Sequence, residues 1–148
     1  MELAQWLHTQ VDEDERIVQA ASWADEANAW HAAPSPYDTW GKDERWYVED
    51  AMEEGLVTHV DPKASDDEGV ARHIAEWDPA RVLREIDAKR QLLALHRPVQ
   101  QRSTGSGGGT IEDCQVCGHF PAQYPCVTLR LLALPYADRP GYREEWRP

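Results

Sequence analysis

The sequence contains no long apolar run, and it has no cysteine outside one short segment. No stretch approaches the roughly 20 apolar residues that a transmembrane helix needs, so we expect no membrane span. The N-terminal residues MELAQWLHTQVDEDE lack a basic region followed by an apolar stretch. We therefore expect no secretory signal peptide and a cytoplasmic location. In that reducing compartment, clustered cysteines are typical of metal ligands or catalytic groups and not of disulfides.

Basic residues are scarce, above all in the first half of the chain. Residues 1–68 carry 18 acidic against 4 basic residues, whereas residues 69–148 carry 9 acidic against 11 basic residues. The acidic half would repel the phosphate backbone of nucleic acids. We interpret it as a solvated acidic surface; the alternative is a patch that docks a basic partner.

The apolar pattern predicts a mainly helical α+β fold in a single domain over residues 1–148, with about four helices around a small antiparallel sheet. Helices are predicted over residues 3–22, 66–77 and 78–96, and a short buried helix is predicted to start at 127 and to be ended by Pro135. Pieces rich in β-branched and aromatic residues predict two or three strands within 28–33, 45–50 and 56–60. The tail is expected to form one irregular turn that lays Tyr142 and Trp146 on the core.

Local signals set the boundaries of these elements. Asp78 and Pro79 favour a helix start, as a cap and a first helical residue, and Pro98 ends that helix. Residues 97–113 include RSTGSGGGT, which is typical of a flexible linker. The acidic run at 12–15 is interpreted as surface charge on the solvent side of the first helix.

All three cysteines lie in residues 114–126, in the stretch CQVCGHFPAQYPC. The spacing of Cys114 and Cys117 lets both sulfurs reach one zinc ion at about 2.3 Å, and Gly118 tolerates the positive φ that such a turn needs. Cys126 comes just before the last predicted helix. We therefore predict a zinc-knuckle loop over residues 114–126, in which the three cysteines bind Zn²⁺.

A tetrahedral zinc site needs a fourth ligand, and His96 is the first candidate because it stands at the end of a predicted helix. His119 is the rival, although its closeness to Cys117 would strain chelation of the same ion. Asp113 or a water molecule is the third candidate. Without a metal, the cysteines would be buried thiols or a redox pair, but the βαβ pattern of thioredoxin-like pairs is absent. A Cys3His set would be closed, and thus structural.

Three blocks carry a recognisable pattern: residues 3–21, 70–96 and 124–148. They resemble an uncharacterised family of small actinobacterial and actinophage proteins, classed as a domain of unknown function, and the C-terminal block PCVTLRLLALPYADRPGYREEWRP is the most specific. The family pattern has a His at the end of the long helix, then Cys-x-x-Cys, then Pro-Cys. Here the matching residues are His96, Cys114, Cys117 and Cys126. The resemblance supports the zinc prediction and implies no activity.

We therefore expect a small zinc-binding accessory or regulatory protein that acts through a protein partner, with phage–host control as a setting. The first alternative is a nucleic-acid-binding zinc knuckle. It would use the basic residues of the C-terminal half: Arg81, Arg84, Lys89, Arg90, Arg97 and Arg102. The second alternative is a metal-dependent hydrolase, which would need an open zinc position and a general base. No H-E-x-x-H motif is present, so we expect no enzyme.

Overall fold

The computed structural model describes residues 1–35, 46–53, 56–60, 67–102, 109–118 and 124–148. The chain divides into two compact units, one of residues 1–14 and 86–148 and one of residues 15–85. We call them unit 1 and unit 2 and treat each by itself. Helices α1 (Leu3–Ala20) and α3 (Pro79–Leu95) contribute residues to both.

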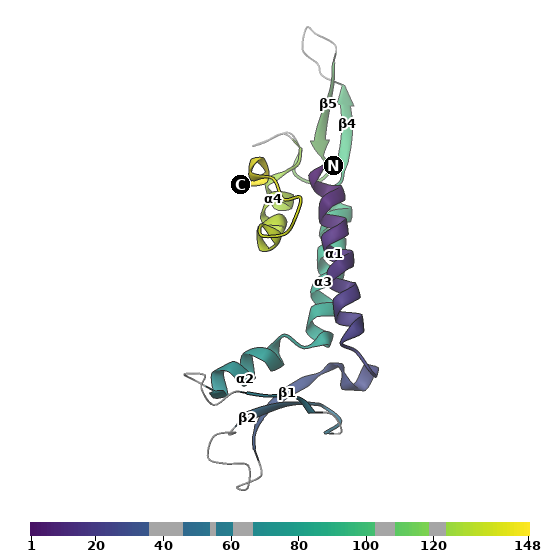
Figure 1. The fold of residues 1–148 in the computed structure, drawn as a ribbon. Helices are drawn as coiled ribbons and strands as arrows, with labels where there is room; N and C mark the ends of the chain where they lie inside the picture. Colours follow the sequence, from purple (N-terminus) through teal and green to yellow (C-terminus); the bar gives the residue numbers. More distant parts are fainter. Residues whose placement is uncertain (36–45, 54–55, 61–66, 103–108, 119–123) are drawn as a thin grey trace. The chain divides into compact units, whose positions relative to one another are not determined.

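Unit 2 is a three-stranded antiparallel sheet with one helix packed on it (Figure 1). The strands β1 (Trp30–Pro34), β2 (Trp46–Asp50) and β3 (Leu56–His59) follow in sequence order, and α2 (Asp67–Glu76) contacts β1 and β2. A short 3₁₀ turn, η1 (Asp25–Asn28), precedes the sheet.

The core of unit 2 joins the sheet to α2. Val48 from β2 and Ala71 from α2 are fully buried, and Trp30, Trp46 and Ile74 pack against this cluster. The predicted start of α3 is confirmed, because the Asp78 carboxylate accepts a 2.6 Å hydrogen bond from the backbone N–H of Arg81. The helix begins at Pro79 and continues into unit 1.

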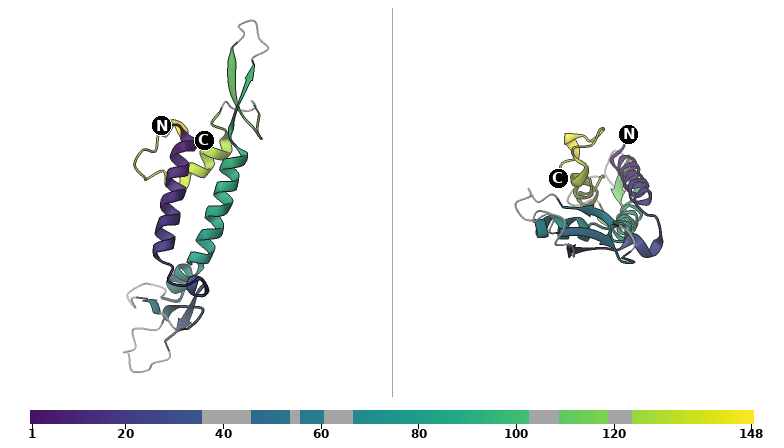
Figure 2. Two further views of the ribbon diagram at one scale, coloured as in Figure 1. Left: turned by 90° about the vertical axis from the view of Figure 1, so that its right-hand side faces the viewer. Right: turned by 60° about the horizontal axis from the view of Figure 1, so that its bottom comes forward.

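Unit 1 combines parts of α1 and α3 with the hairpin β4 (Pro98–Arg102) and β5 (Thr110–Cys114), the helix α4 (Val127–Ala133), and two 3₁₀ turns, η2 (Leu134–Tyr136) and η3 (Glu144–Trp146). Figures 1 and 2 show α1 running alongside α3. The apolar face of α1 is almost inaccessible to solvent. Within unit 1, its buried residues are Leu3, Trp6, Leu7 and Val11. From α3 and α4, Ile86 and Leu129 complete this core.

Trp6 ties the C-terminal tail to α1. Its ring centroid lies 5.8 Å from that of Tyr142 and 5.3 Å from that of Trp146, and its indole N–H donates a 3.1 Å hydrogen bond to the Pro140 carbonyl. Gly141 has φ +89°, and a Cβ built there would lie 2.9 Å from Trp6 Nε1. The tail thus lays its aromatic residues on the core as predicted. Gly141 is required there by its positive φ and by the close approach of the Trp6 ring.

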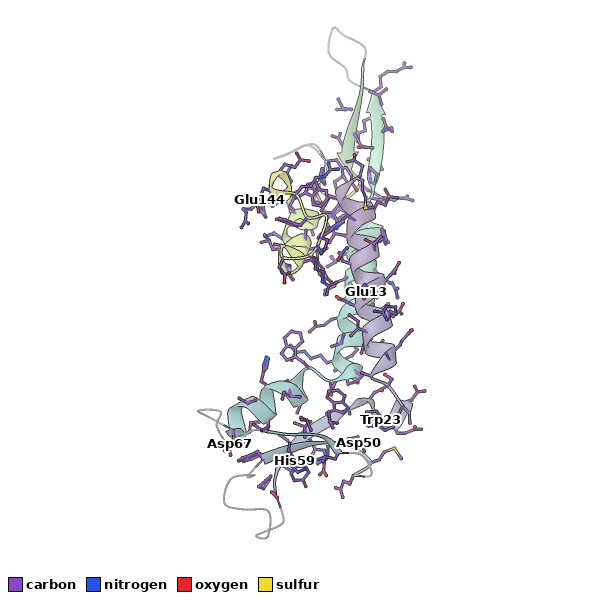
Figure 3. The ribbon with its side chains drawn as sticks, in the orientation of Figure 1. Glu13, Trp23, Asp50, His59, Asp67 and Glu144 are labelled. Atoms are coloured by element: carbon purple, nitrogen blue, oxygen red, sulfur yellow. The ribbon has the colours of Figure 1, made fainter. Side chains whose placement is uncertain are left out.

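The outer side of the tail is exposed. Glu144, labelled in Figure 3, accepts hydrogen bonds from Arg147, the shorter of them 2.9 Å. This hydrogen bonding lowers the pKa of Glu144 from its ordinary value.

The predicted α+β class is confirmed: the described residues form four α-helices and two small antiparallel sheets. The sheet β4–β5 was not predicted. It occupies both ends of the predicted linker over 97–113, whose central residues 103–108 lie outside the described part of the chain. Backbone pairing from Pro98↔Cys114 to Arg102↔Thr110 orders these ends, although few of their side chains are buried. That the chain forms a single domain stays a prediction.

Candidate metal centre

Three elements of unit 1 bring four candidate ligands to one point. His96 directly follows α3, and its backbone N–H still donates to the Leu92 carbonyl at 2.9 Å. Cys114 is the last residue of β5, and Cys126 is the residue that precedes α4. Cys117 lies in the turn after β5.

The hairpin explains how Cys114 returns to His96 over 18 residues of chain. Pro98 pairs with Cys114 in the register of β4 and β5, and the backbone N–H of Gln115 donates to the Arg97 carbonyl at 3.0 Å. The base of the hairpin therefore sets the two ligands close together. The sequence predicted the same closeness through a flexible linker, without the pairing that produces it.

The turn after β5 has the conformation expected of a zinc knuckle. Gly118 has φ +67°, and its backbone N–H donates a 2.8 Å hydrogen bond to the Cys114 carbonyl. The backbone N–H of Cys117 points at the Cys114 sulfur, with a separation of 3.5 Å. The predicted positive φ at Gly118 is thus confirmed, and the turn brings both thiols to one side.

The four candidate ligand atoms lie within 4.8 Å of one another. His96 Nδ1 is 3.3 Å from the sulfur of Cys114 and 3.5 Å from the sulfurs of both Cys117 and Cys126. A tetrahedral zinc ion with bonds of about 2.3 Å to sulfur and about 2.0 Å to nitrogen would place each sulfur about 3.5 Å from that nitrogen. The spacing of the group therefore fits a single tetrahedral metal ion.

Hydrogen bonds alone do not explain this convergence. One imidazole nitrogen offers a single proton or a single lone pair, whereas three sulfurs surround Nδ1 of His96 at nearly equal distances. All three cysteines are free thiols in the structure, so no disulfide accounts for their proximity. A shared metal ion is the simplest group that all four atoms can bind at once.

The site is largely closed to solvent. The exposed fraction is 1% for Cys114, 2% for Cys126 and 8% for His96, and Cys117 is partly buried. Four protein ligands in a buried tetrahedral arrangement leave no position for a reacting water, which is typical of a structural metal site.

Two of the thiols, those of Cys114 and Cys126, have shifted pKa values. Burial alone would raise the pKa of Cys114, but hydrogen bonds from the backbone amides of Cys117 and Val116 bring it below its ordinary value. Burial raises the pKa of Cys126 to about 11. A metal ion must therefore displace a proton from Cys126, whereas the Cys114 sulfur is already prepared to carry negative charge.

Of the two other side-chain candidates, Asp113 alone lies in the described part of the chain. His119 lies outside the described residues, and Asp113, although buried, does not belong to the four-residue cluster. The structure thus brings together the three cysteines and His96, which was the first candidate for the fourth ligand.

One polar network of unit 1 was not predicted from the sequence. Asp14 accepts hydrogen bonds from the Tyr136 hydroxyl at 2.7 Å and from the Arg139 guanidinium at 2.5 Å, and Lys89 donates to the same hydroxyl at 2.8 Å. The predicted solvent-side position of the whole acidic run is therefore wrong for Asp14, whose side chain is only 19% exposed.

A family model matches residues 1–148. The chain belongs to DUF6221, a family of unknown function. The predicted resemblance to an uncharacterised family is thereby confirmed, while the actinobacterial and actinophage origin stays a prediction. For this DUF6221 chain, searches of curated proteins and of solved structures found no match. None of the helices in the described part of the chain has the length and apolar character needed to cross a bilayer.

Proposed function

We propose that this DUF6221 chain is a zinc-binding accessory or regulatory protein, in which zinc is structural and the partner is a protein. The observation that carries the zinc assignment is the convergence of three sulfurs on His96 Nδ1 at 3.3 to 3.5 Å. Thiolate and imidazole ligands in a tetrahedral set favour zinc over harder cations such as Mg²⁺ or Ca²⁺.

The zinc would join the end of α3, the hairpin and the start of α4, because each contributes a ligand. The described surface of unit 1 also carries exposed apolar side chains, which supports a protein partner. On α4, Val127 and Leu131 are 40% and 53% exposed and lie one turn apart on the same helix face. The resemblance to actinophage proteins makes phage–host control the setting that we propose.

Contacts within the chain weigh against the nucleic-acid alternative. Arg90 pairs with Asp12 at 2.8 Å, and Lys89 donates to Tyr136, so two of the basic residues considered for that role have partners within unit 1. A mobility shift with single-stranded DNA that fades as salt is added would favour this alternative.

Metal content tests the zinc assignment. The chain is expressed with zinc supplied, and zinc is measured by elemental analysis in wild type, Cys117→Ser, His96→Ala and His8→Ala. We expect about one zinc per chain in wild type and in His8→Ala, whose histidine is exposed on α1, and loss of zinc in the other two. A His96→Cys variant should keep its zinc, because four cysteines also form a closed set.

Three results would contradict parts of this assignment. Wild type without zinc would refute the site. Retention of zinc by His96→Ala would place the fourth ligand elsewhere. An exchangeable water on the cobalt-substituted protein would indicate an open position, and thus the hydrolase alternative.

The partner assignment has its own measurement. A protein that co-purifies with wild type should be lost with Leu131→Glu while the zinc content stays unchanged. Equal recovery with both chains would remove α4 from the proposed contact.

A further inference from the structure

A cleft of about 430 Å³ lies in unit 2, apart from the candidate zinc ligands. Strand β1 contributes Trp30 and Ala32 to its wall, α2 contributes Ala75 and Arg72, and the beginning of α3 contributes further residues. Its volume falls within the range of about 300–1,000 Å³ that is typical of small-molecule sites.

Three arginines line this cleft: Arg72, Arg81 and Arg84. They stand out because residues 15–85 carry 17 acidic residues against only 7 basic ones. Three of the seven basic residues of unit 2 therefore line this one cleft, although the unit as a whole is acidic. Guanidinium groups repel one another at such a place unless an anion lies between them.

The acidic residues of the wall have other partners. One carboxylate oxygen of Asp78 accepts from the backbone N–H of Arg81 at 2.6 Å, and the other accepts from the backbone N–H of Trp30 at 3.3 Å. Glu76, whose side chain is 74% exposed, pairs with Arg81 at 3.2 Å. The Asp78 carboxylate is thus held by backbone donors and is not paired with the Arg72 or Arg84 side chain.

The arginines differ in how far they are already paired. Arg81 also bonds Glu85 at 3.0 Å and stacks over the Trp77 ring at 4.3 Å, so its position is set from two sides. Arg72 pairs with Glu68 at 2.6 Å across one helical turn. Arg84 has no acidic partner among the residues that the structure describes, which leaves its guanidinium group available to a ligand.

We propose that this cleft binds a small organic molecule through a phosphoryl group. Arginine forms paired, charge-assisted hydrogen bonds with phosphate oxygens, and Arg84 and Arg72 supply them from two helices. The cleft is much larger than a phosphate ion, and Trp30, Ala32 and Ala75 offer apolar surface to the rest of the ligand. This site is independent of the proposed zinc.

Phenyl phosphate and inorganic phosphate are the probes, each added to the full ¹⁵N-labelled chain at low ionic strength. The indole N–H signal of Trp30 reports on the cleft, and it is identified among the seven tryptophans as the signal absent from Trp30→Phe. We expect a saturable shift with phenyl phosphate at a dissociation constant of about 1 mM, and weaker binding of inorganic phosphate.

Arg84→Gln should weaken binding of phenyl phosphate about tenfold or more, because it removes charged hydrogen bonds. Arg84→Lys should lie between wild type and Arg84→Gln, since lysine keeps the charge and loses the planar fork. The matched control is Arg147→Gln, which changes the net charge equally in the C-terminal tail of unit 1 and should bind as wild type does.

Equal affinity of wild type and Arg84→Gln, or no saturable shift of the Trp30 signal, would overturn the proposal. If inorganic phosphate binds as tightly as phenyl phosphate, the organic part of the ligand is refuted. If Arg147→Gln weakens binding as much as Arg84→Gln does, the interaction is general charge attraction, and the site is likewise refuted.

Discussion

Replacement of Gly141 by alanine should destabilise the chain more than any other described Gly→Ala change. A residue with a side chain pays about 1–2 kcal/mol to adopt a left-handed backbone, and Gly141 has φ +89°. The new Cβ would also lie 2.9 Å from Trp6 Nε1 and 3.3 Å from Trp6 Cδ1. The indole must then move and weaken its hydrogen bond to the Pro140 carbonyl, which contributes about 0.5–1.5 kcal/mol. The expected loss of unfolding free energy is about 2–3 kcal/mol.

Gly118 is the matched control, because it combines a positive φ with open space. Its φ is +67°, and a Cβ there would meet no atom within 4 Å. Gly118→Ala should therefore lower the free energy of unfolding by about 1–2 kcal/mol, which is the cost of a left-handed backbone alone. Both variants are unfolded with urea in saturating zinc, and far-UV circular dichroism gives the free energy of unfolding at an unchanged denaturant slope. If Gly141→Ala costs no more than Gly118→Ala, the close packing of Trp6 on the tail is refuted.

Two further predictions concern the Asp14 network and the thiols. Asp14→Asn should lower the unfolding free energy by about 1–3 kcal/mol, since it weakens the bonds from Tyr136 and Arg139; Asp12→Asn, whose side chain is 64% exposed, should change it by under about 1 kcal/mol. Equal losses in urea unfolding would contradict a special role for Asp14. Zinc affinity, measured by chelator competition, should rise with pH by about tenfold per pH unit for each proton displaced, because burial raises the pKa of Cys126 to about 11. An affinity that does not change from about pH 6 to about pH 8 would show that zinc displaces no thiol proton.

The candidate ligand set could be predicted from the sequence because its signals are local. Cys114 and Cys117 have knuckle spacing, Gly118 permits the turn, and His96 follows a helix whose start and end are marked by Asp78 and Pro98. Each of these signals lies within a few residues of the feature that it predicts. The structure then shows that the four side chains lie together.

The hairpin and the Asp14 network could not be predicted, for different physical reasons. β4 and β5 bury little, and Val99 and Ile111 are the only branched aliphatic residues in their mostly polar sequence, so no alternating pattern indicates strands. Their order comes from backbone pairing, which depends little on the identity of the side chains. Asp14 meets its partners across 122 and 125 residues, a distance over which no local pattern carries information.

The make-up of unit 1 has a consequence for the order in which the chain folds during synthesis. The buried face of α1, with Leu3 and Trp6, has its partners in residues 86–148, whereas unit 2 is formed by one continuous stretch, residues 15–85. A ribosome releases the first helix long before it makes Tyr142 and Trp146, which lie against the Trp6 ring. Unit 2 can therefore fold while the chain is still growing, whereas the apolar face of the first helix gains its cover in steps, from α3, then α4, and at Trp6 only once Tyr142 and Trp146 are made.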